Sequence, residues 1–105
     1  MDINQVREQL TDFRNKVSQM ISVEEMIVFG SYAQETASKT SDIDVMIIST
    51  DFKRLRSDKR LKILDEAAAF IRPEIVAAGF TREELNQASL LSLLGQAREG
   101  GIRFQ

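Results

Sequence analysis

Two short apolar runs limit the folds that this chain can adopt. The first, Met26-Ile27-Val28-Phe29, ends at Gly30, and the second, Ile43–Ile48, is rich in β-branched side chains. Apolar runs this short, with β-branched residues, are typical of buried strands. The glycine after the first run is typical of a tight turn. The chain therefore needs a sheet, and its other segments must cover that sheet.

Apolar residues recur at helical spacing in two further segments. In the first twenty residues they lie three or four apart, which predicts an amphipathic helix. A second helix is expected from an N-cap at Ser57 to Arg72, because Pro73 disfavours helical geometry in the residue before it. The stripe residues that predict these helices are Ile3, Val6, Leu10, Phe13, Val17 and Met20, then Leu61, Leu64, Ala68 and Ile71.

The last third of the chain predicts a third strand and two shorter helices. Residues 74–78 read as a strand closed by Gly79, and Thr81 with Glu84 has the form of a capping box. A final helix follows from the leucines and alanine of 90–97 and stops at Gly100-Gly101. Residues 102–104 are expected to form an edge strand.

The order of these elements predicts one α/β (α+β) domain over residues 1–105, with a small mixed β-sheet and helices mostly on one side. The length of 105 residues suits a single core. No apolar run reaches the roughly 18 residues of a membrane span, and the N-terminus is polar, without the pattern of a signal peptide. We therefore expect a soluble, cytoplasmic protein with no membrane contact.

The chain has no cysteine and no histidine. This composition removes thiolate nucleophiles, histidine bases, and thiolate and imidazole metal ligands. Carboxylates that hold a hard cation such as Mg²⁺ remain available. The net charge of −2 and seven aromatic residues make nucleic-acid binding unlikely, although six basic residues cluster between Lys53 and Lys62.

The segment GSYAQETASKTSDID holds the candidate site. Residues i and i+2 of a strand face the same side, so Asp42 and Asp44 should project together while Ile43 and Val45 enter the core. Two adjacent carboxylates repel each other unless a cation is shared between them. Gly30 and Ser31 at a strand end offer N–H groups and a hydroxyl to a phosphate.

Gly-Ser, a ten-residue spacer and Asp-x-Asp together resemble the signature of the DNA polymerase β-like nucleotidyltransferases. More narrowly, the chain resembles the minimal nucleotidyltransferases, which are often encoded beside HEPN-domain proteins as toxin–antitoxin pairs. The resemblance implies Mg²⁺-dependent transfer of a nucleoside monophosphate, usually from ATP, to a hydroxyl. In HEPN pairs the acceptor is a tyrosine of the toxin.

The same resemblance implies a role for each matching residue. Gly30 and Ser31 would hold the triphosphate, Asp42 and Asp44 would bind Mg²⁺, and Glu74 would be the third carboxylate and help to accept the hydroxyl proton. The alternative for Glu74 is a surface residue after a proline. The weaker candidates for the third carboxylate are Asp51, Asp65 and Glu66.

One departure from the family pattern bears on activity. Many relatives read Gly-Ser-x-Ala-Arg-Gly, whereas this chain has Gln34-Glu35 in place of Arg-Gly. Either Lys39 or the cluster between Lys53 and Lys62 replaces the missing cation, or triphosphate binding is weak. A solvated helix face is the plain interpretation of that cluster. Tyr32 is expected to pack, with base stacking or modification of Tyr32 itself as alternatives.

Two functions follow from these features. The first is a nucleotidyltransferase antitoxin that modifies a protein partner, a HEPN-domain toxin. The second is a catalytically weak or inert module of the same fold that neutralises a partner by occlusion. A homo-oligomer is a further alternative, because the apolar stripe of the first helix could pack against a second copy of the chain as well as against the core.

Overall fold

The computed structural model describes residues 1–104 and contains one mixed sheet with the strand order β3-β2-β1-β4. β1 (Glu25–Phe29) pairs in antiparallel fashion with β2 (Ile43–Ile48) and with β4 (Ile102–Phe104). β2 runs parallel to β3 (Ile75–Phe80). The predicted fold class is therefore confirmed, and the expected edge strand at 102–104 is present.

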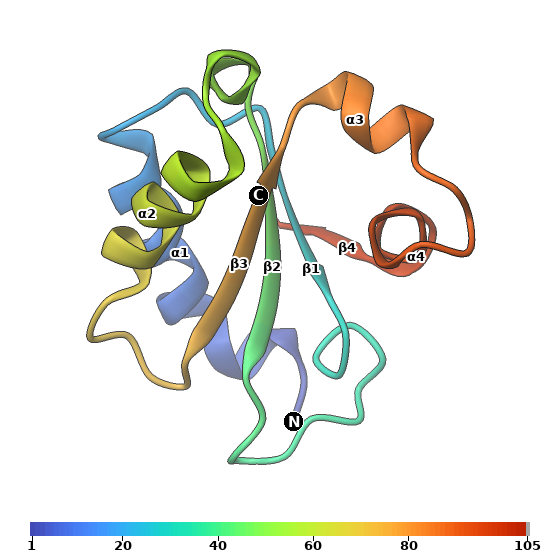
Figure 1. Cartoon of the computed structure of the whole chain (residues 1–105). Coiled ribbons are helices and arrows are strands. Elements are labelled where there is room, and N and C mark those ends of the chain that lie inside the picture. Colours follow the sequence, from blue (N-terminus) through green and yellow to red (C-terminus); the bar gives the residue numbers. More distant parts are fainter. Residues whose placement is uncertain (105) are drawn as a thin grey trace.

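Helices cover both faces of this sheet (Figure 1). A 3-10 turn, η1 (Ile3–Val6), leads into α1 (Arg7–Ser18), which lies on one face with α2 (Ser57–Ala68). The shorter α3 (Arg82–Gln87) and α4 (Leu93–Gly100) lie on the other face. The prediction of helices mostly on one side was wrong, because the alternate residues of β1 and β2 are also apolar and need a cover of their own.

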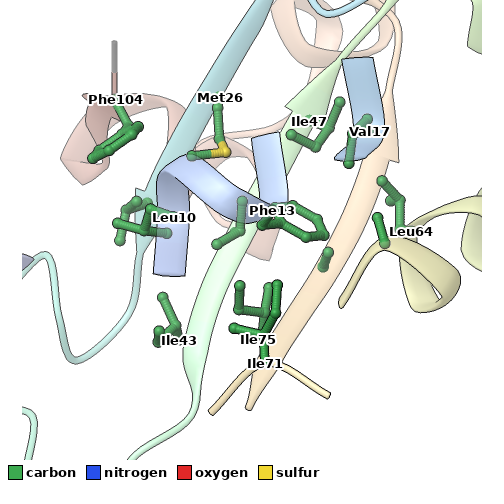
Figure 2. Close-up of a cluster of buried hydrophobic side chains, with 14 of the residues drawn as sticks. Leu10, Phe13, Val17, Met26, Ile43, Ile47, Leu64, Ile71, Ile75 and Phe104 are labelled. Carbon is green, nitrogen blue, oxygen red and sulfur yellow. The ribbon is translucent and has the colours of Figure 1, made fainter. Parts of the chain in front are cut away.

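The larger core lies between the sheet and the pair α1 and α2 (Figure 2). Leu10, Phe13 and Val17 of α1 enter it together with Leu64 of α2, and all four are fully buried. The sheet contributes every second residue of its strands, as the period of two requires. These sheet residues are Met26, Val28, Ile43, Val45, Ile47, Ile75, Ala77 and Phe104.

A smaller core lies under α3 and α4. Ile27 and Met46 meet Leu85 of α3 and Ala97 of α4, and each of these side chains is at most 2% exposed. This second cluster covers only part of its face of the sheet. The amino-terminal end of β2 on that face carries a polar residue, Asp44, in place of an apolar one.

α2 differs from its prediction at both ends. Its N-cap is Arg56 and not Ser57, which is the first helical residue. The helix ends at Ala68, four residues before Arg72, because Phe70 takes a left-handed conformation with φ of 67°. Ile71 is nevertheless buried, so its apolar character reports burial and not helix.

Two other boundaries also moved. Gly79 lies inside β3 and does not close it. A Cβ at this position would meet the ring of Phe52, which lies in the 3-10 turn η2 (Thr50–Arg54) after β2. The glycine therefore makes room for that ring. α4 begins at Leu93, so Leu90 and Leu91 lie outside it. The capping box at Thr81 is confirmed, with reciprocal hydrogen bonds between Thr81 and Glu84.

Within residues 1–104, no helix is long and apolar enough to cross a membrane.

Candidate functional site

The turn after β1 forms one half of the candidate site. Gly30 O accepts hydrogen bonds from Ala33 N (3.1 Å) and Gln34 N (3.2 Å), and Ser31 O accepts one from Thr36 N (2.9 Å). These bonds close a single helical turn directly at the end of the strand. In the described part of the chain, the backbone N–H groups of Ser31 and Tyr32 have no hydrogen-bond acceptor. They are the free donors expected at the start of a helical turn.

Gly30 is in direct contact with the side chain of Asp44. Phe29 and Asp44 are register partners of β1 and β2, so the residue that follows Phe29 passes over this carboxylate. Gly30 has φ of 68°, and a Cβ on it would overlap Asp44 Oδ2. Only glycine satisfies both the left-handed conformation and the close approach. The turn and the acidic strand thus form one continuous surface.

Asp42 and Asp44 form the acidic half of the site. Asp44 lies within β2, whereas Asp42 immediately precedes the strand and is exposed. Burial raises the pKa of the Asp44 carboxyl, and the charge of Asp42 raises it further. This mutual repulsion would be relieved by a cation held between the two groups.

Glu74 lies beside this pair along the backbone. Ile43 N donates a hydrogen bond to Glu74 O (2.8 Å), which places Glu74 next to the start of β2, just before β3. Its side chain is exposed. Within residues 1–104, no three His, Cys, Asp or Glu side chains converge as a metal site. The role of Glu74 as third ligand therefore stays a prediction.

The weaker candidates for the third carboxylate lie elsewhere. Asp51 accepts a hydrogen bond from Ser22 N (2.8 Å) at the opposite end of β2. Asp65 and Glu66 are on the exposed surface of α2, across the sheet from Asp44. The β3 partner of Asp44 is Val76, which is 48% exposed and which the sequence patterns did not single out.

The polar loop from Thr36 to Ser41 carries Lys39. Hydrogen bonds among Ser38, Thr40 and Ser41 hold this loop, and the N-terminal amine donates to Ala37 O (2.7 Å). Lys39 is exposed, three residues before Asp42. It is therefore on the segment that joins the turn to the acidic pair.

The basic cluster between Lys53 and Lys62 does not reach this end of the sheet. It begins beyond the carboxyl end of β2, and six strand residues at about 3.3 Å each separate it from Asp42 by roughly 20 Å. Arg60 is turned inward, with hydrogen bonds to Leu55 O, Phe52 O and Gly79 O. The expectation that this cluster replaces the missing cation is therefore not supported by its position, and Lys39 is the cation nearer in the chain.

The Gln34-Glu35 departure lies at the end of the turn. Both side chains are exposed, and Glu35 has φ of 61°. A residue with a Cβ is strained in this left-handed conformation, which suits the glycine that the family resemblance leads us to expect at this position. Tyr32, by contrast, is 1% exposed and packs in the larger core, and its hydroxyl has no hydrogen-bond partner among residues 1–104. This burial is the packing that the sequence predicted.

Comparison with known proteins identifies the family of this fold and site. The family described as the nucleotidyltransferase domain matches residues 10–96, which include the turn and the acidic pair. The chain belongs to the nucleotidyltransferase domain family. Among curated protein sequences, none matches the chain significantly.

Two solved structures share the nucleotidyltransferase fold. One is a protein from Sulfolobus solfataricus described as a nucleotidyltransferase, with a TM-score of 0.72 and 18% identity over 95% of this chain and 79% of that one. The other belongs to a toxin–antitoxin complex with AMP-PNP, with a TM-score of 0.61 and 21% identity over 92% of this chain and 70% of that one. At these identities the likeness concerns the fold.

The candidate site also has a small hollow of about 100 Å³ beside the turn. Phe29, Gly30 and Ala33 line it from one side, and Leu93 and Gln96 of α4 line it from the other. Sequence patterns could not place α4 here, because no local signal reports which helix packs against the end of β1. The hollow connects the turn with the second helical layer.

Proposed function

We propose that this chain is a divalent-metal-dependent nucleotidyltransferase that transfers a nucleoside monophosphate, AMP from ATP, to a hydroxyl of a partner protein. The observation that carries the proposal is the contact between Gly30 and Asp44, which joins a turn with free N–H donors to an acidic pair. The family assignment supports the reaction class. The likeness to a toxin–antitoxin structure with AMP-PNP supports an antitoxin role, with a HEPN-domain toxin as the partner.

The donor set at this end of the sheet fits a hard dication. It consists of carboxylate oxygens, and the repulsion that raises the pKa of Asp44 would be offset by a bound cation. Asp42 and Asp44 would hold Mg²⁺, with Glu74 as the third ligand. When bound, Mg²⁺ neutralises phosphate charge and stabilises the attacking and leaving oxygens of an in-line displacement.

The residues of the chain would position the nucleotide and manage one proton. Gly30, Ser31 and Lys39 would bind the triphosphate through backbone N–H groups, a hydroxyl and a positive charge. The acceptor oxygen forms a bond to the α-phosphorus, the bond from the α-phosphorus to the bridging oxygen breaks, and pyrophosphate leaves. Glu74 would help to accept the proton that the hydroxyl releases.

A second candidate is a weak or inert nucleotidyltransferase that neutralises its partner by occlusion. Two observations favour it. Val76, an apolar residue, is the strand partner of Asp44, and Glu35 adds negative charge to the turn that would bind phosphate. Both would weaken binding of a metal–nucleotide complex without disturbing the fold.

Incubation with α-labelled ATP and Mg²⁺ tests the first proposal. The purified chain is mixed with the protein encoded beside it and with extract of its own cells, and label on protein is followed. We expect Mg²⁺-dependent label that disappears in the Asp42→Asn/Asp44→Asn double variant. Tight association with a partner but no label would favour occlusion, and so would full protection of cells by Asp44→Asn.

Glu74→Gln tests the third ligand separately. If Glu74 completes the metal site, this variant should lose most of the transfer activity while it folds as the parent does, because its side chain is exposed. Transfer at the parent rate would remove Glu74 from the site and leave the aspartate pair.

A further inference from the structure

Three leucines lie exposed around the start of α4: Leu90 and Leu91 precede the helix, and Leu93 is its first residue. Leu90 is 63% exposed, Leu91 is 90% exposed and Leu93 is 67% exposed. We call these three residues the leucine patch. The fold does not need them, because Leu94 and Ala97 supply the apolar contacts of α4 with the sheet. Their exposure therefore calls for a role outside the core.

Hydrogen bonds fix the backbone that carries the leucine patch. Ser92 Oγ donates to Ser89 O (2.7 Å) and accepts from Gly95 N (2.9 Å), while Leu91 N donates to Ser89 Oγ (3.2 Å). A Cβ at Gly95 would overlap Ser89 O, so the segment packs directly on the first turn of α4. The leucines are thus presented on an ordered backbone, which lowers the entropy lost on binding.

The leucine patch adjoins the candidate site through Leu93. Leu93 lines the same hollow as Phe29 and Gly30. Gly30 in turn contacts Asp44, the residue proposed to bind the metal. A protein that offers a hydroxyl to this site would therefore meet Leu93 in the same encounter, and Leu90 and Leu91 lie three and two residues before it in the chain.

The size of the leucine patch argues against a stable homodimer. Three leucine side chains at 63–90% exposure make a patch no larger than the apolar patches found on single proteins, which are on the order of a few hundred Å². A stable interface needs about 800 Å² on each partner, whereas transient encounters are smaller. An acceptor protein that must dissociate after modification fits this area better than a permanent second copy.

We propose that the leucine patch is the docking surface for the acceptor protein, which covers it with an apolar surface next to its acceptor hydroxyl. This proposal rests on the proposed transfer to a protein hydroxyl. Substitutions in the leucine patch should change recognition of the acceptor without changing nucleotide binding, because the leucine patch adjoins the site but carries no phosphate or metal ligand.

Photocrosslinking in cells tests the occupant. A benzoylphenylalanine is installed at position 91 and, as the matched control, at position 70, where Phe70 is 96% exposed but lies after α2, across the sheet from the leucine patch. We expect position 91 alone to capture the protein that receives the label. Capture of a second copy of the chain, the same capture at position 70, or no capture at position 91 would overturn the proposal.

Leu91→Ser and Phe70→Ser then separate docking from catalysis. We expect Leu91→Ser to raise the KM for the acceptor protein at least tenfold, with unchanged ATP affinity, and Phe70→Ser to have no effect. Parent-like transfer by Leu91→Ser would overturn docking and leave the transferase intact. A different pair of results would reject the transferase and not the docking surface. In that case, capture at position 91 persists in the Asp42→Asn/Asp44→Asn background, and the parent chain places no label on any protein.

Discussion

Gly30 lies against the carboxylate of Asp44, so that the turn after β1 and the acidic end of β2 fit together without room for a methyl group between them. The contact follows from the antiparallel register of Phe29 with Asp44 and from the left-handed conformation of Gly30. Two residues that are fourteen positions apart in the sequence motif thus meet at one point in space. This contact makes the glycine as necessary to the site as the aspartate.

Gly30→Ala should therefore damage both the fold and the site. The left-handed conformation alone costs a non-glycine residue roughly 1–2 kcal/mol, and the overlap with Asp44 adds to it. We expect a loss of about 2–3 kcal/mol in the free energy of unfolding, measured by urea denaturation. Gly100→Ala is the control, because a Cβ there meets nothing within 4 Å and the helix gains about 0.5–1 kcal/mol. Equal stability of the two variants would contradict the contact.

The strands and the core could be predicted because the spacing of apolar residues within a segment follows from which side of that segment is buried. Ile43–Ile48 was located to the residue, and the apolar residues at helical spacing in α1 enter the larger core. The end of α2 could not be predicted, since the chain leaves the helix through Phe70 in a conformation that no local signal favours. Gly79 likewise looked like a strand end but makes room for the ring of Phe52.

The candidate site was predictable in its motif but not in its neighbours. The spacing of Gly30-Ser31 and Asp42-x-Asp44 could be read from the chain, whereas Asp42 precedes β2 and acts on Asp44 through its charge. The register of β3 against β2 could not, because parallel pairing is set by tertiary packing. That register places Val76 beside Asp44 and leaves Glu74 before the strand, beside the start of β2.

Asp44→Asn should raise the thermal stability at neutral pH in the absence of metal. Burial and the charge of Asp42 raise the pKa of Asp44 in the fold above the ordinary value of 3.8. The folded state therefore binds the proton more tightly than the unfolded state, and the parent loses stability as pH rises from 3.8 through the raised value. We expect the variant to melt above the parent at pH 7 and to lose this advantage in acid, as measured by calorimetry.

Mg²⁺ should reverse that order. The parent gains stability from any cation that binds only its folded state, whereas the variant lacks one ligand. Calorimetry with and without MgCl₂ measures both effects, and Asp12→Asn, at an exposed i,i+4 ion pair with Lys16, controls for nonspecific screening. A parent that melts at the same temperature with and without Mg²⁺ would argue against a metal site at the pair.

Glu35→Gly should stabilise the turn. Glu35 has φ of 61°, and glycine removes the penalty of a Cβ in that conformation, which we expect to add about 0.5–1 kcal/mol to the free energy of unfolding. Gln34→Gly is the matched control, because Gln34 has no such φ and should lose stability. Glu35→Gln removes the charge alone, so tighter ATP binding in both Glu35 variants would assign the effect to charge. Tighter binding in Glu35→Gly alone would assign it to the backbone.

Arg60 should be a stability residue and not a phosphate ligand, although it lies in the most basic part of the chain. Its guanidinium donates to Phe52 O (2.6 Å), Leu55 O (2.9 Å) and Gly79 O (3.2 Å), and its side chain is 13% exposed. Arg60→Ala removes the guanidinium donor from all three carbonyls, although Phe52 O keeps its bond from Leu55 N. At about 1–3 kcal/mol for each buried group that loses its partner, a total loss of about 3 kcal/mol is expected. Urea denaturation measures it.

Glu84→Gln separates the ion pair from the carbonyl contacts of Arg60. Burial opposes ionisation of Glu84, but hydrogen bonds from Thr81 N and Arg60 lower its pKa overall, so its contribution is present above pH 4.5 and is lost as pH falls through the lowered value. The Glu84 side chain is 44% exposed, so the ion pair at 2.8 Å contributes at most about 1 kcal/mol. We therefore expect Glu84→Gln to cost far less than Arg60→Ala at pH 7. Equal losses would mean that the ion pair with Glu84 of α3, and not the carbonyl contacts with η2 and β3, accounts for the effect of Arg60 on stability.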